Sequence, residues 1–312
     1  MERISAAEGG CGPQFFFFFF FFFLMIAAAL LHPDVSTKVV DRFRSSGAEI
    51  KIQDTLDNSA NCSAALIFGG DGTVHRHLSQ LHQHKTPTLV VPTGSGNDFA
   101  KALGIRSLET AVRTWEQFCA AEKNADGRNI KEIDLGVIRA EGRQALFCCV
   151  AGVGMDAEAN ARANRMPPWL KSRGGYVLAG LQSLIAFKPT EMNITADGRE
   201  IRRSAFFIAV GNALSYGGGM KVTPQATLDD GLLDICLVSK MNKLKLLCWV
   251  PTIFFGKHLH LKEVEYFQAR QIAIEAERKL DLYADGDYAA QTPVEIGVIR
   301  RGLRVIVPAS PS

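Results

Sequence analysis

Two short loops contain the residue types and spacings that best suit phosphate chemistry. The first is Gly69-Gly70-Asp71-Gly72-Thr73, which directly follows the apolar residues 64–68. Its glycines let the backbone approach a ligand closely, and a helix starting there would offer unpaired N–H groups at the positive end of its dipole. Asp71 would repel a phosphate unless a cation lies between them, so the loop indicates Mg²⁺ or a bound water. Taken alone, a Gly-Gly-Asp-Gly pattern is explained equally well by a tight turn.

The second loop, residues 92–100, repeats this arrangement one strand further along the chain. It adds hydroxyls at Thr93 and Ser95, and polar side chains at Asn97 and Asp98 that can donate, accept or cap a helix. Two Asp-containing loops of the phosphate type side by side predict a nucleotide site with a metal.

Neither loop matches a better-known nucleotide fingerprint. Phe99 stands where a Rossmann G-x-G-x-x-G would have its last glycine. The chain also has no G-x-x-x-x-G-K-[ST] sequence, which excludes a P-loop ATPase at the level of motifs.

The two loops are expected at one edge of a parallel sheet. Between residues 24 and 121, apolar strand-like segments alternate with helical patterns, which is typical of βαβ units. The predicted strands are residues 24–31, 48–52, 64–68 and 88–91, and the predicted helices include residues 35–46 and 108–121. Because the last two strands run straight into the two loops, both loops lie where open α/β sheets bind ligands.

Beyond a turn-rich linker at residues 124–127, the pattern becomes β-rich. Short apolar or alternating segments separated by turn residues predict a second, mainly antiparallel domain. These segments are residues 130–139, 144–151, 192–196, 204–211, 232–238, 271–277, 294–298 and 303–307, with helical insertions at 156–164, 174–186 and 243–255.

Composition narrows the class of protein. Of the 312 residues, 47% are hydrophobic and 21% charged, which is typical of a globular chain long enough for two domains. The net charge of +3 gives no electrostatic reason to expect a nucleic-acid partner. The seven cysteines are scattered and form no C-x-x-C pair, which indicates a reducing compartment rather than a disulfide framework or a zinc ribbon.

An uninterrupted apolar run at residues 15–31 opens with phenylalanine at every position from 15 to 23. Its 17 residues are at the low end for a membrane-spanning helix, and the acidic Glu2 and Glu8 before it do not suit a secretory signal. We expect residues 1–23 to be a low-complexity segment or a wrongly assigned start, before a first strand at residues 24–31. If the run does insert, the basic residues that follow it would keep the remainder of the chain in the cytoplasm.

Together with several later motifs, the two loops resemble the diacylglycerol kinase catalytic domain family, which includes sphingosine kinases and bacterial lipid kinases. The later motifs are Asp134-Leu135-Gly136, residues 152–157, Gly211-Asn212-Ala213, Gly217-Gly218-Gly219, residues 224–226, residues 229–234 and Asp285-Gly286-Asp287. The resemblance extends from about residue 24 to residue 308, and the order of the motifs is far more specific than any one of them.

The resemblance implies a fold and an activity. The fold would be an α/β nucleotide-binding domain with a Rossmann-like parallel sheet at residues 24–125 and a β-sandwich domain at residues 126–312. The activity would be ATP-dependent phosphorylation of a lipid hydroxyl, with diacylglycerol as the expected substrate, in the cleft between the domains.

The resemblance also implies which residues meet the nucleotide and the metal. ATP would be held by Gly69, Gly70, Gly72 and Thr73 in the first loop, and by Thr93, Gly94, Ser95 and Asn97 in the second. A structural Mg²⁺ would be bound by Asp230 and by main-chain carbonyls at Thr227 and Leu232.

The catalytic carboxylates implied by the resemblance are Asp71, Asp98 and Asp287, with Asp287 as the base and Asp71 in the metal and water network. The chemistry agrees, because phosphoryl transfer depends mainly on positioning and charge neutralisation, and one carboxylate near the attacking hydroxyl can take its proton. Without the resemblance, a hairpin turn is the better interpretation of Asp285-Gly286-Asp287.

The first predicted turn departs from the family pattern. Relatives carry a glycine-rich turn containing Asn-Pro after the first strand, whereas residues 30–38 here retain only Pro33 and the hydroxyl residues. Ser36, Thr37 and Lys38 are the available substitutes for contacting the nucleotide.

Four histidines at positions 75, 77, 82 and 84 follow the first loop. Their spacing does not suit zinc, so a solvated helix face is the better interpretation, although His75 is close enough in sequence to meet phosphate. The apolar stretches at residues 177–187 and 244–255 suit either the core or contact with a membrane.

Other functions stay open at this point. NAD kinase shares the Gly-Gly-Asp-Gly-Thr loop on a related fold, a sphingoid base is an alternative lipid substrate, and a non-catalytic lipid-binding protein could keep the fold. The expected partners are ATP, Mg²⁺ and a lipid at a membrane surface, without nucleic acid, and a homodimer is compatible with the sequence. We expect a cytoplasmic protein, with binding to the inner face of the membrane as an option.

Overall fold

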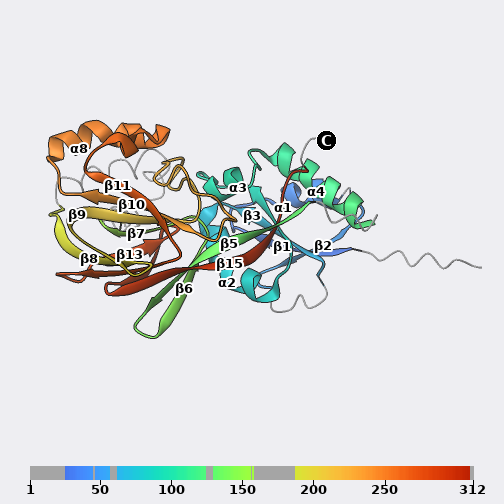
Figure 1. Cartoon of the computed structure of the whole chain (residues 1–312). Helices are drawn as coiled ribbons and strands as arrows, with labels where there is room; N and C mark the ends of the chain where they lie inside the picture. Colours follow the sequence, from blue (N-terminus) through green and yellow to red (C-terminus); the bar gives the residue numbers. More distant parts are fainter. Residues whose placement is uncertain are drawn as a thin grey trace, which may run out of the picture.

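A single mixed sheet of 15 strands runs through the computed structural model, which describes residues 25–44, 46–56, 62–123, 129–155, 157 and 187–309. Its main path has the order β14-β13-β7-β9-β8-β12-β15-β4-β3-β1-β2. The last four strands form a parallel part, and most others an antiparallel part at the opposite end of the molecule (Figure 1). The predicted fold class, a parallel α/β part followed by a β-rich part, is confirmed.

The parallel part contains the first four strands and the helices between them. The strands are β1 (Ile26–Leu31), β2 (Glu49–Gln53), β3 (Ala64–Gly69) and β4 (Thr88–Pro92), and the helices are α1 (Thr37–Arg44), α2 (Asp71–His84), α3 (Asp98–Ala102) and α4 (Leu108–Lys123). Every residue of β3 is buried, as expected for a strand covered on both faces. Helices α1 and α4 pack together through the indole N–H of Trp115, which donates to the carbonyl of Phe43 at 3.0 Å.

The antiparallel part contains the remaining strands. They are β5 (Ile130–Ala140), β6 (Arg143–Phe147), β7 (Val150–Gly154), β8 (Thr190–Ala196), β9 (Arg199–Gly211), β10 (Leu233–Ser239), β11 (Val264–Ala269), β12 (Gln271–Ala276), β13 (Asp281–Ala284), β14 (Asp287–Gln291) and β15 (Val294–Ile306). Between β10 and β11 lie the helix α8 (Lys243–Trp249) and the 3₁₀ segments η2 (Val250–Phe255) and η3 (Lys257–His260). Strand β8 alternates buried and less buried residues, the pattern of a sheet with one covered face.

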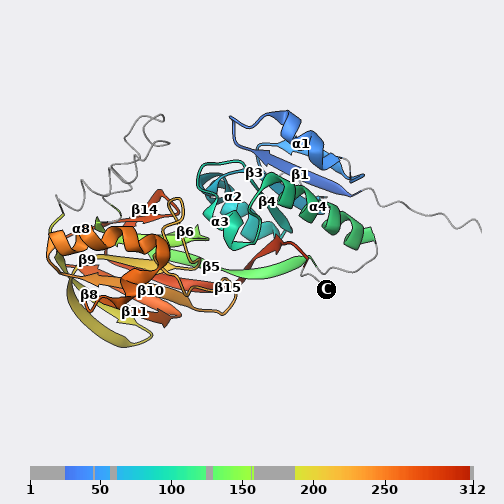
Figure 2. The same cartoon turned by 90° about the horizontal axis from the view of Figure 1, so that it is seen from above.

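Strands β5 and β15 join the two parts. β15 first pairs with β12, from Val294 to Gly297, and later reaches β4 through the pairing of Val305 with Thr88. It is also paired with β5 along most of its length. The end of the C-terminal half therefore completes the sheet of the N-terminal half, as Figure 2 shows where β5 and β15 run between the two parts. A domain boundary near residue 125 stays a prediction.

Several predicted elements differ from the structure for physical reasons. The segment predicted as one strand at residues 144–151 is split between β6 and β7 at Cys148 and Cys149, whose backbone N–H groups donate to the Asp285 carboxylate instead of a neighbouring strand. The two strands predicted at residues 294–298 and 303–307 are one strand, β15, with a shift of register between Ile299 and Leu303. The helix predicted at residues 243–255 becomes 3₁₀ from Val250, next to Pro251.

Other sequence predictions lie outside the described residues. These are the apolar run before residue 25, the linker at residues 124–127 and, apart from residue 157 and Phe187, the helical insertions between residues 156 and 187. Strands β11, β13 and β14 were not among the predicted strands. Within the described ranges, no helix is both long enough and apolar enough to cross a membrane.

Candidate active site

The two glycine loops touch because strands β3 and β4 are neighbours in the parallel sheet. Gly69 pairs with Pro92 at the strand ends, and the backbone N–H of Thr93 donates to the carbonyl of Gly69 at 3.2 Å. A Cβ atom on Gly94 would lie 2.5 Å from the Cα atom of Gly70. Position 94 therefore requires glycine, because the backbones of the two loops approach each other closely there. The two loops thus form one continuous surface.

Helix α2 begins at the first loop with an open N-terminus. Its N-cap residue is Gly70, so no side chain caps the helix. A Cβ atom on Gly72 would meet no atom within 4 Å. The N-terminus of this 14-residue helix, the positive end of its dipole, is therefore uncapped by a side chain and open at Gly72, while the N–H of Thr73 donates to the carbonyl of Gly70 at 3.0 Å. Such a terminus is suited to binding a phosphate.

Asp71 closes the N-terminus of the neighbouring helix α3. Its Oδ1 accepts the backbone N–H of Phe99 at 2.9 Å, and its Oδ2 accepts the N–H of Asp98 at 3.1 Å. Burial raises the pKa of Asp71 above its ordinary value, the two backbone hydrogen bonds lower it, and the negative charges of Asp98 and Asp285 raise it again. A cation bound near these three carboxylates would relieve their mutual repulsion.

Asp98 fastens the C-terminal half of the chain to the second loop. Its side chain is 1% exposed, and Oδ2 accepts the backbone N–H groups of Gly218 at 2.6 Å and Gly219 at 3.2 Å. The hydroxyl of Ser215 donates to Oδ1 at 3.4 Å. Gly217, Gly218 and Gly219 all have positive φ angles, a run of backbone that glycine adopts most easily. Asp98 therefore holds a glycine turn in place across the two halves.

The side chain of Asn97 shapes the second loop. Asn97 has a left-handed φ of 55°, its Oδ1 accepts the N–H of Gly94 at 2.9 Å, and its Nδ2 donates to the carbonyl of Gly94 at 2.6 Å. Each polar atom thereby has a partner within the loop, so the side chain of Asn97 fixes the backbone of Gly94.

The hydroxyl of Thr93 stands out in the same loop. It is buried, and no hydrogen-bond partner accompanies it among the described residues. Leaving a buried hydroxyl unpaired costs stability, and a ligand or a water supplies the missing partner in such sites. Ser95 is exposed. Of the second-loop residues predicted to line the nucleotide site, Thr93 has the strongest structural reason to meet a ligand.

The Asp285-Gly286-Asp287 motif forms the hairpin between β13 and β14. Ala284 pairs with Asp287, and both intervening residues have positive φ, 50° at Asp285 and 94° at Gly286, as a two-residue type I′ turn requires. The hairpin interpretation of this motif is therefore confirmed. Asp287 is the exposed first residue of β14, immediately after the turn.

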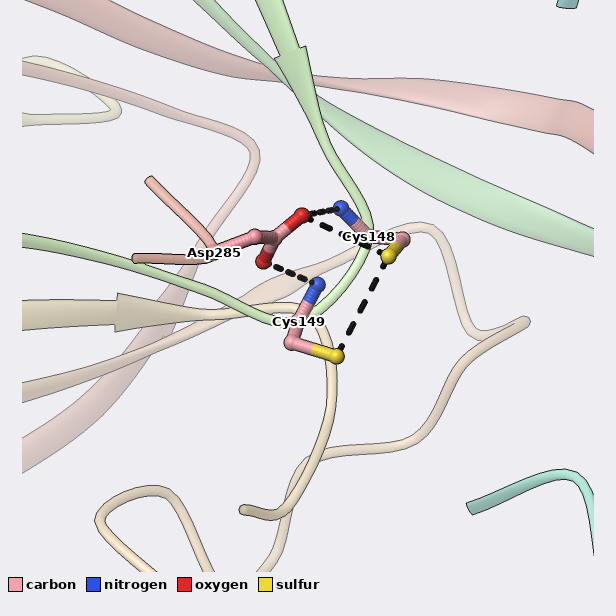
Figure 3. A group of neighbouring side chains, drawn as sticks. All are labelled: Cys148, Cys149 and Asp285. Carbon is pink, nitrogen blue, oxygen red and sulfur yellow. Dashed lines mark hydrogen bonds between the residues drawn. The ribbon is translucent and has the colours of Figure 1, made fainter. Parts of the chain in front are cut away.

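Asp285 binds the backbone between β6 and β7. Its carboxylate accepts the N–H groups of Cys148 at 2.8 Å, Cys149 at 2.9 Å and Val150 at 3.1 Å, as Figure 3 shows for the two cysteines. Nδ1 of His75 lies 3.3 Å from Oδ2 of the same carboxylate. Burial alone would raise the pKa of Asp285, but the hydrogen bond and charge of His75 and these backbone N–H groups hold it below its ordinary value.

His75 links the hairpin to the first loop. It is one turn along α2 from the open N-terminus and contacts Asp285 from the C-terminal half. Burial alone would lower the pKa of His75, but the hydrogen bond and charge of Asp285, with the charge of Asp287, raise it above its ordinary value. Asp287 thus lies close enough to act electrostatically on the helix whose N-terminus is open.

Cys148, Cys149 and Asp285 lie close enough together for metal ligands, but their chemistry does not fit an ion (Figure 3). Burial raises the pKa of Cys148 to about 12, and the pKa of Cys149 is raised well above its usual range by its hydrogen bond with Cys148 and by burial. Metals bind the thiolate, not the thiol. Both oxygens of Asp285 already accept backbone N–H groups. We therefore interpret this group as structural.

The predicted magnesium site lies before strand β10. Asp230 is exposed, and its Oδ1 accepts the backbone N–H of Leu232 at 2.9 Å. Burial raises the pKa of Asp234, hydrogen bonds from Tyr266 and Gln268 lower it, and the negative charge of Asp230 raises it again. The carboxylates of Asp230 and Asp234, with main-chain carbonyls nearby in sequence such as that of the exposed Thr227, are the kinds of oxygen donor that Mg²⁺ prefers. The residues present therefore fit the ion.

Asp134 anchors this loop to the long strands. Its carboxylate accepts the backbone N–H of Gly231 and that of Arg301, each at 2.7 Å. The buried Asn212 then donates to the carbonyls of Asp134 at 2.9 Å and Cys148 at 3.1 Å. These two residues of the quoted motifs thus position backbone, and sequence reasoning had assigned them no role.

The divergent first turn lies beside the first loop. The N–H of His32 donates to the carbonyl of Phe68 at 2.8 Å, next to Gly69. Ser36, Thr37 and Lys38 are exposed at the start of α1, where the Ser36 hydroxyl accepts the N–H of Lys38 at 3.4 Å. They occupy the correct sheet edge, and their contact with a nucleotide stays a prediction.

Comparison with known proteins agrees with this geometry. Residues 29–137 match the diacylglycerol kinase catalytic domain, and residues 149–307 match the YegS C-terminal NAD kinase beta sandwich-like domain. A diacylglycerol kinase of Mycobacterium tuberculosis is 36% identical over 247 residues, covering 78% of this chain and 77% of that protein. A diacylglycerol kinase of Bacillus subtilis is 29% identical, covering 78% of this chain and 77% of that protein.

Solved structures show the same fold. A putative diacylglycerol kinase of Bacillus anthracis superposes with a TM-score of 0.71 at 22% identity, covering 91% of this chain and 95% of that chain. An NAD kinase of Archaeoglobus fulgidus in complex with ATP superposes with a TM-score of 0.51 at 15% identity, covering 91% and 94%. With both halves matched in order and a relative at 36% identity, the chain belongs to the family of diacylglycerol kinases and related lipid kinases.

Proposed function

We propose that this protein transfers the γ-phosphoryl group of ATP to the hydroxyl of diacylglycerol, which yields phosphatidic acid. The observation that carries the proposal is the open N-terminus of α2, next to two touching glycine loops and linked to the Asp285–Asp287 hairpin through His75. The names of the relatives at 36% and 29% identity favour diacylglycerol as the lipid.

The phosphates of ATP are expected to lie against the first loop. There the backbone N–H groups after Gly70 would supply hydrogen bonds and the helix dipole positive potential, while Gly72 leaves the approach open and Gly69 packs against the side chain of Thr73. The unpaired hydroxyl of Thr93 offers a further polar contact from the second loop, beside Gly94 and Ser95. Asn97 would act indirectly, by holding Gly94.

Asp287 is the base in this proposal. Asp98 is buried, with Oδ2 accepting from the glycine turn and Oδ1 from the hydroxyl of Ser215. Asp71 caps α3 with both oxygens, whereas Asp287 is exposed. Asp287 would take the proton of the lipid hydroxyl as its oxygen bonds to the γ-phosphorus and the bond to ADP breaks. Asp71 and Asp98 would serve catalysis through positioning and negative charge.

Mg²⁺ belongs to the proposal in two places. With the nucleotide, it would neutralise phosphate charge beside Asp71 and Asp98, as the metal does in other phosphoryl transfers. A structural ion would be held by Asp230 with the carbonyls of Thr227 and Leu232, which suit a hard cation.

The remaining parts of the proposal concern organisation and location. We assign residues 24–125 to the nucleotide domain and 126–312 to the lipid domain, with β15 returning to complete the first sheet. Because the substrate is a membrane lipid, the protein would work at the inner face of a membrane, where ATP is present. A homodimer stays a prediction.

A substrate panel tests the proposed activity. Full-length protein is incubated with labelled ATP and Mg²⁺ and with diacylglycerol, monoacylglycerol, sphingosine or NAD in separate reactions. We expect label in phosphatidic acid and none when a chelator removes the metal. Preferential labelling of sphingosine or NAD would show that diacylglycerol is not the preferred substrate. No transfer to any member of the panel would contradict the kinase proposal.

Asp287→Asn tests the base. Asn keeps the size and turn preference of Asp, so we expect an unchanged melting temperature and unchanged ATP binding, with turnover lower by about 10²- to 10⁴-fold. Asp281→Asn, on the other strand of the same hairpin, is the matched control and should retain turnover. If Asp287→Asn turns over at the parental rate, Asp287 is only a turn residue and the base must be sought at Asp71 or Asp98.

A further inference from the structure

Exposed hydrophobic side chains are concentrated on one element far from the glycine loops in sequence. Among the described residues, five of the seven large exposed hydrophobic side chains fall between residues 244 and 255. They are Leu244, Leu247, Val250, Phe254 and Phe255, with exposed fractions of 68%, 42%, 40%, 38% and 73%. We refer to these five side chains as the apolar ridge.

The apolar ridge is the outer side of an element that is firmly attached by its inner side. Spacings of three residues place Leu244, Leu247 and Val250 along one side of α8 and its C-cap, and the exposed Phe254 and Phe255 follow in the continuous 3₁₀ segment η2. Leu246 is only 6% exposed and Ile253 packs against the core, so the inner side of the segment is already satisfied. Isolated exposed hydrophobic residues are normal, but a row of them indicates an interaction surface.

The charges around the apolar ridge indicate what the surface binds. Residues 243–260 contain Lys243, Lys245 and Lys257 but no Asp or Glu. Exposed Lys240 and Lys262 flank the segment, and the acidic Glu263, which follows it, pairs with Lys245 at 2.8 Å. Leu and Phe on one side of a short helix with lysines along its borders is the composition of helices that lie in the interface of an anionic membrane.

We propose that the apolar ridge and its lysine border dock the protein on an anionic lipid surface. Leu244 and Phe255, the two most exposed members, would enter the acyl boundary while the lysine ammonium groups stay at the level of the lipid phosphates. This proposal depends on the proposed function in one respect: a lipid kinase must reach a substrate that stays in the membrane, which gives the protein a reason to dock.

The docking surface is bonded to the loop that holds the catalytic cleft together. The N–H of Lys221 donates to the carbonyl of Ile253 at 3.1 Å, and Nε2 of His258 lies 3.1 Å from the carbonyl of Val222. The same loop contains Gly218 and Gly219, whose N–H groups donate to Asp98. The apolar ridge is thus joined by short hydrogen-bonded steps to the second glycine loop, so docking would set the orientation of the two glycine loops relative to the membrane.

Vesicle sedimentation without ATP tests docking independently of catalysis. We expect the full-length protein to bind phosphatidylcholine vesicles more strongly when they also contain phosphatidylglycerol. The variant Leu244→Gln/Phe255→Gln should bind these mixed vesicles roughly 10- to 100-fold more weakly, because two large side chains no longer enter the bilayer. The matched control is Ile52→Gln, an equally apolar residue, 48% exposed, on β2 at the opposite end of the molecule (Figure 1).

The lysines are tested in the same way. Lys257→Gln/Lys262→Gln should weaken binding to the mixed vesicles about 10-fold or more while changing binding to pure phosphatidylcholine little. The control is Lys51→Gln, next to Ile52 on β2. Equal binding of parent and ridge variants to mixed vesicles overturns the proposal, and so does failure of the parent to bind them. Concentration-dependent dimerisation that only the ridge variants abolish would assign the surface to a second copy instead.

A fluorescent probe at Cys248 provides a readout that does not depend on the folding of a ridge variant. Cys248 is exposed within the segment, so a polarity-sensitive dye can be attached there after Cys11 and Cys62 are changed to serine. Its emission should shift to the blue with mixed vesicles, and an unchanged spectrum contradicts docking through this surface. Phosphorylation of short-chain diacylglycerol in detergent separates the two proposals, because the ridge variants should retain it. Vesicle binding without any phosphorylation would support docking and contradict the kinase proposal.

Discussion

Helices α2 and α3 begin alike in sequence but differ at their N-termini in the fold. Each follows a strand of the parallel sheet and a glycine loop, and each has an aspartate in its first turn, Asp71 or Asp98. Asp71 leaves its own helix and caps α3, whereas no side chain caps α2. The two loops therefore differ: the first leads into a helix without a side-chain cap, and the second leads into a helix that Asp71 caps.

The same device recurs in the rest of the site. Asp98 binds the glycine turn at residues 217–219, and Asp285 binds the backbone of Cys148 and Cys149. Each of these carboxylates accepts hydrogen bonds from backbone N–H groups of another segment. The N-terminus of α2 differs, because no side chain caps it. An exception of this kind, in a family of kinases, is the place where we expect anionic oxygens to bind.

Of the changes that test this difference between α2 and α3, breaking the cap on α3 should have the largest effect. Asp71→Asn retains one acceptor oxygen, so one of the N–H groups of Asp98 and Phe99 loses its partner, and one negative charge disappears from the cleft. We expect kcat/KM for ATP to fall by more than about 10²-fold. Steady-state kinetics measure this, with Asp41→Asn on the exposed side of α1 as the control. Near-parental kinetics would mean that capping α3 and the Asp71 charge are both irrelevant to turnover.

Gly94→Ala tests whether the two loops must touch. The added methyl carbon would lie 2.5 Å from the Cα of Gly70 and 2.8 Å from its N atom, so the loops must separate. We expect KM for ATP to rise by about 10-fold or more and the melting temperature to fall, since overpacking of this kind costs about 1–3 kcal/mol. Parental KM with a reduced melting temperature would show that loop contact serves stability alone.

Sequence reasoning identified the elements of this site better than its connections. Continuous apolar runs before two glycine loops were enough to predict β3, β4 and the ligand-binding edge, because buried parallel strands have that pattern. The cap from Asp71 to α3 spans 27 residues, and the clamp from Asp285 to Cys148 spans 137, so no local pattern reveals them. The split between β6 and β7 was missed for this reason.

The pair of His75 and Asp285 predicts a pH dependence that ties the open helix to the hairpin. His75→Gln keeps an N–H donor but removes the positive charge. His75 has a pKa above its ordinary value of 6.5, so the stability it contributes is present below about pH 6.5 and is lost as the pH rises through its folded pKa. Asp285 has a pKa below 3.8, so its contribution is present above that pH and lost in stronger acid.

The difference in unfolding free energy between parent and His75→Gln should therefore be largest between about pH 4 and 6.5, at roughly 1–2 kcal/mol, and should shrink above it. Urea titrations at a series of pH values measure this difference. His84→Gln, at the other end of α2, is the comparison variant. A difference that grows as the pH rises from 6 to 9 would contradict a charged His75 paired with Asp285.

The smallest effect, and the sharpest contrast with Gly94, is expected at Gly72. Its side chain position faces open space, so Gly72→Ala should not strain the fold and should stabilise α2 by about 0.5–1 kcal/mol, because alanine is the better helix former. If phosphate binds at the open N-terminus, the same methyl group intrudes on the ligand, and ATP affinity should fall several-fold. Stability and affinity would then change in opposite directions at Gly72 and in the same direction at Gly94. Thermal unfolding measures the stability of the two variants, and ATP titration measures their affinity. Unchanged ATP affinity in Gly72→Ala would show that the phosphates do not bind at the N-terminus of α2.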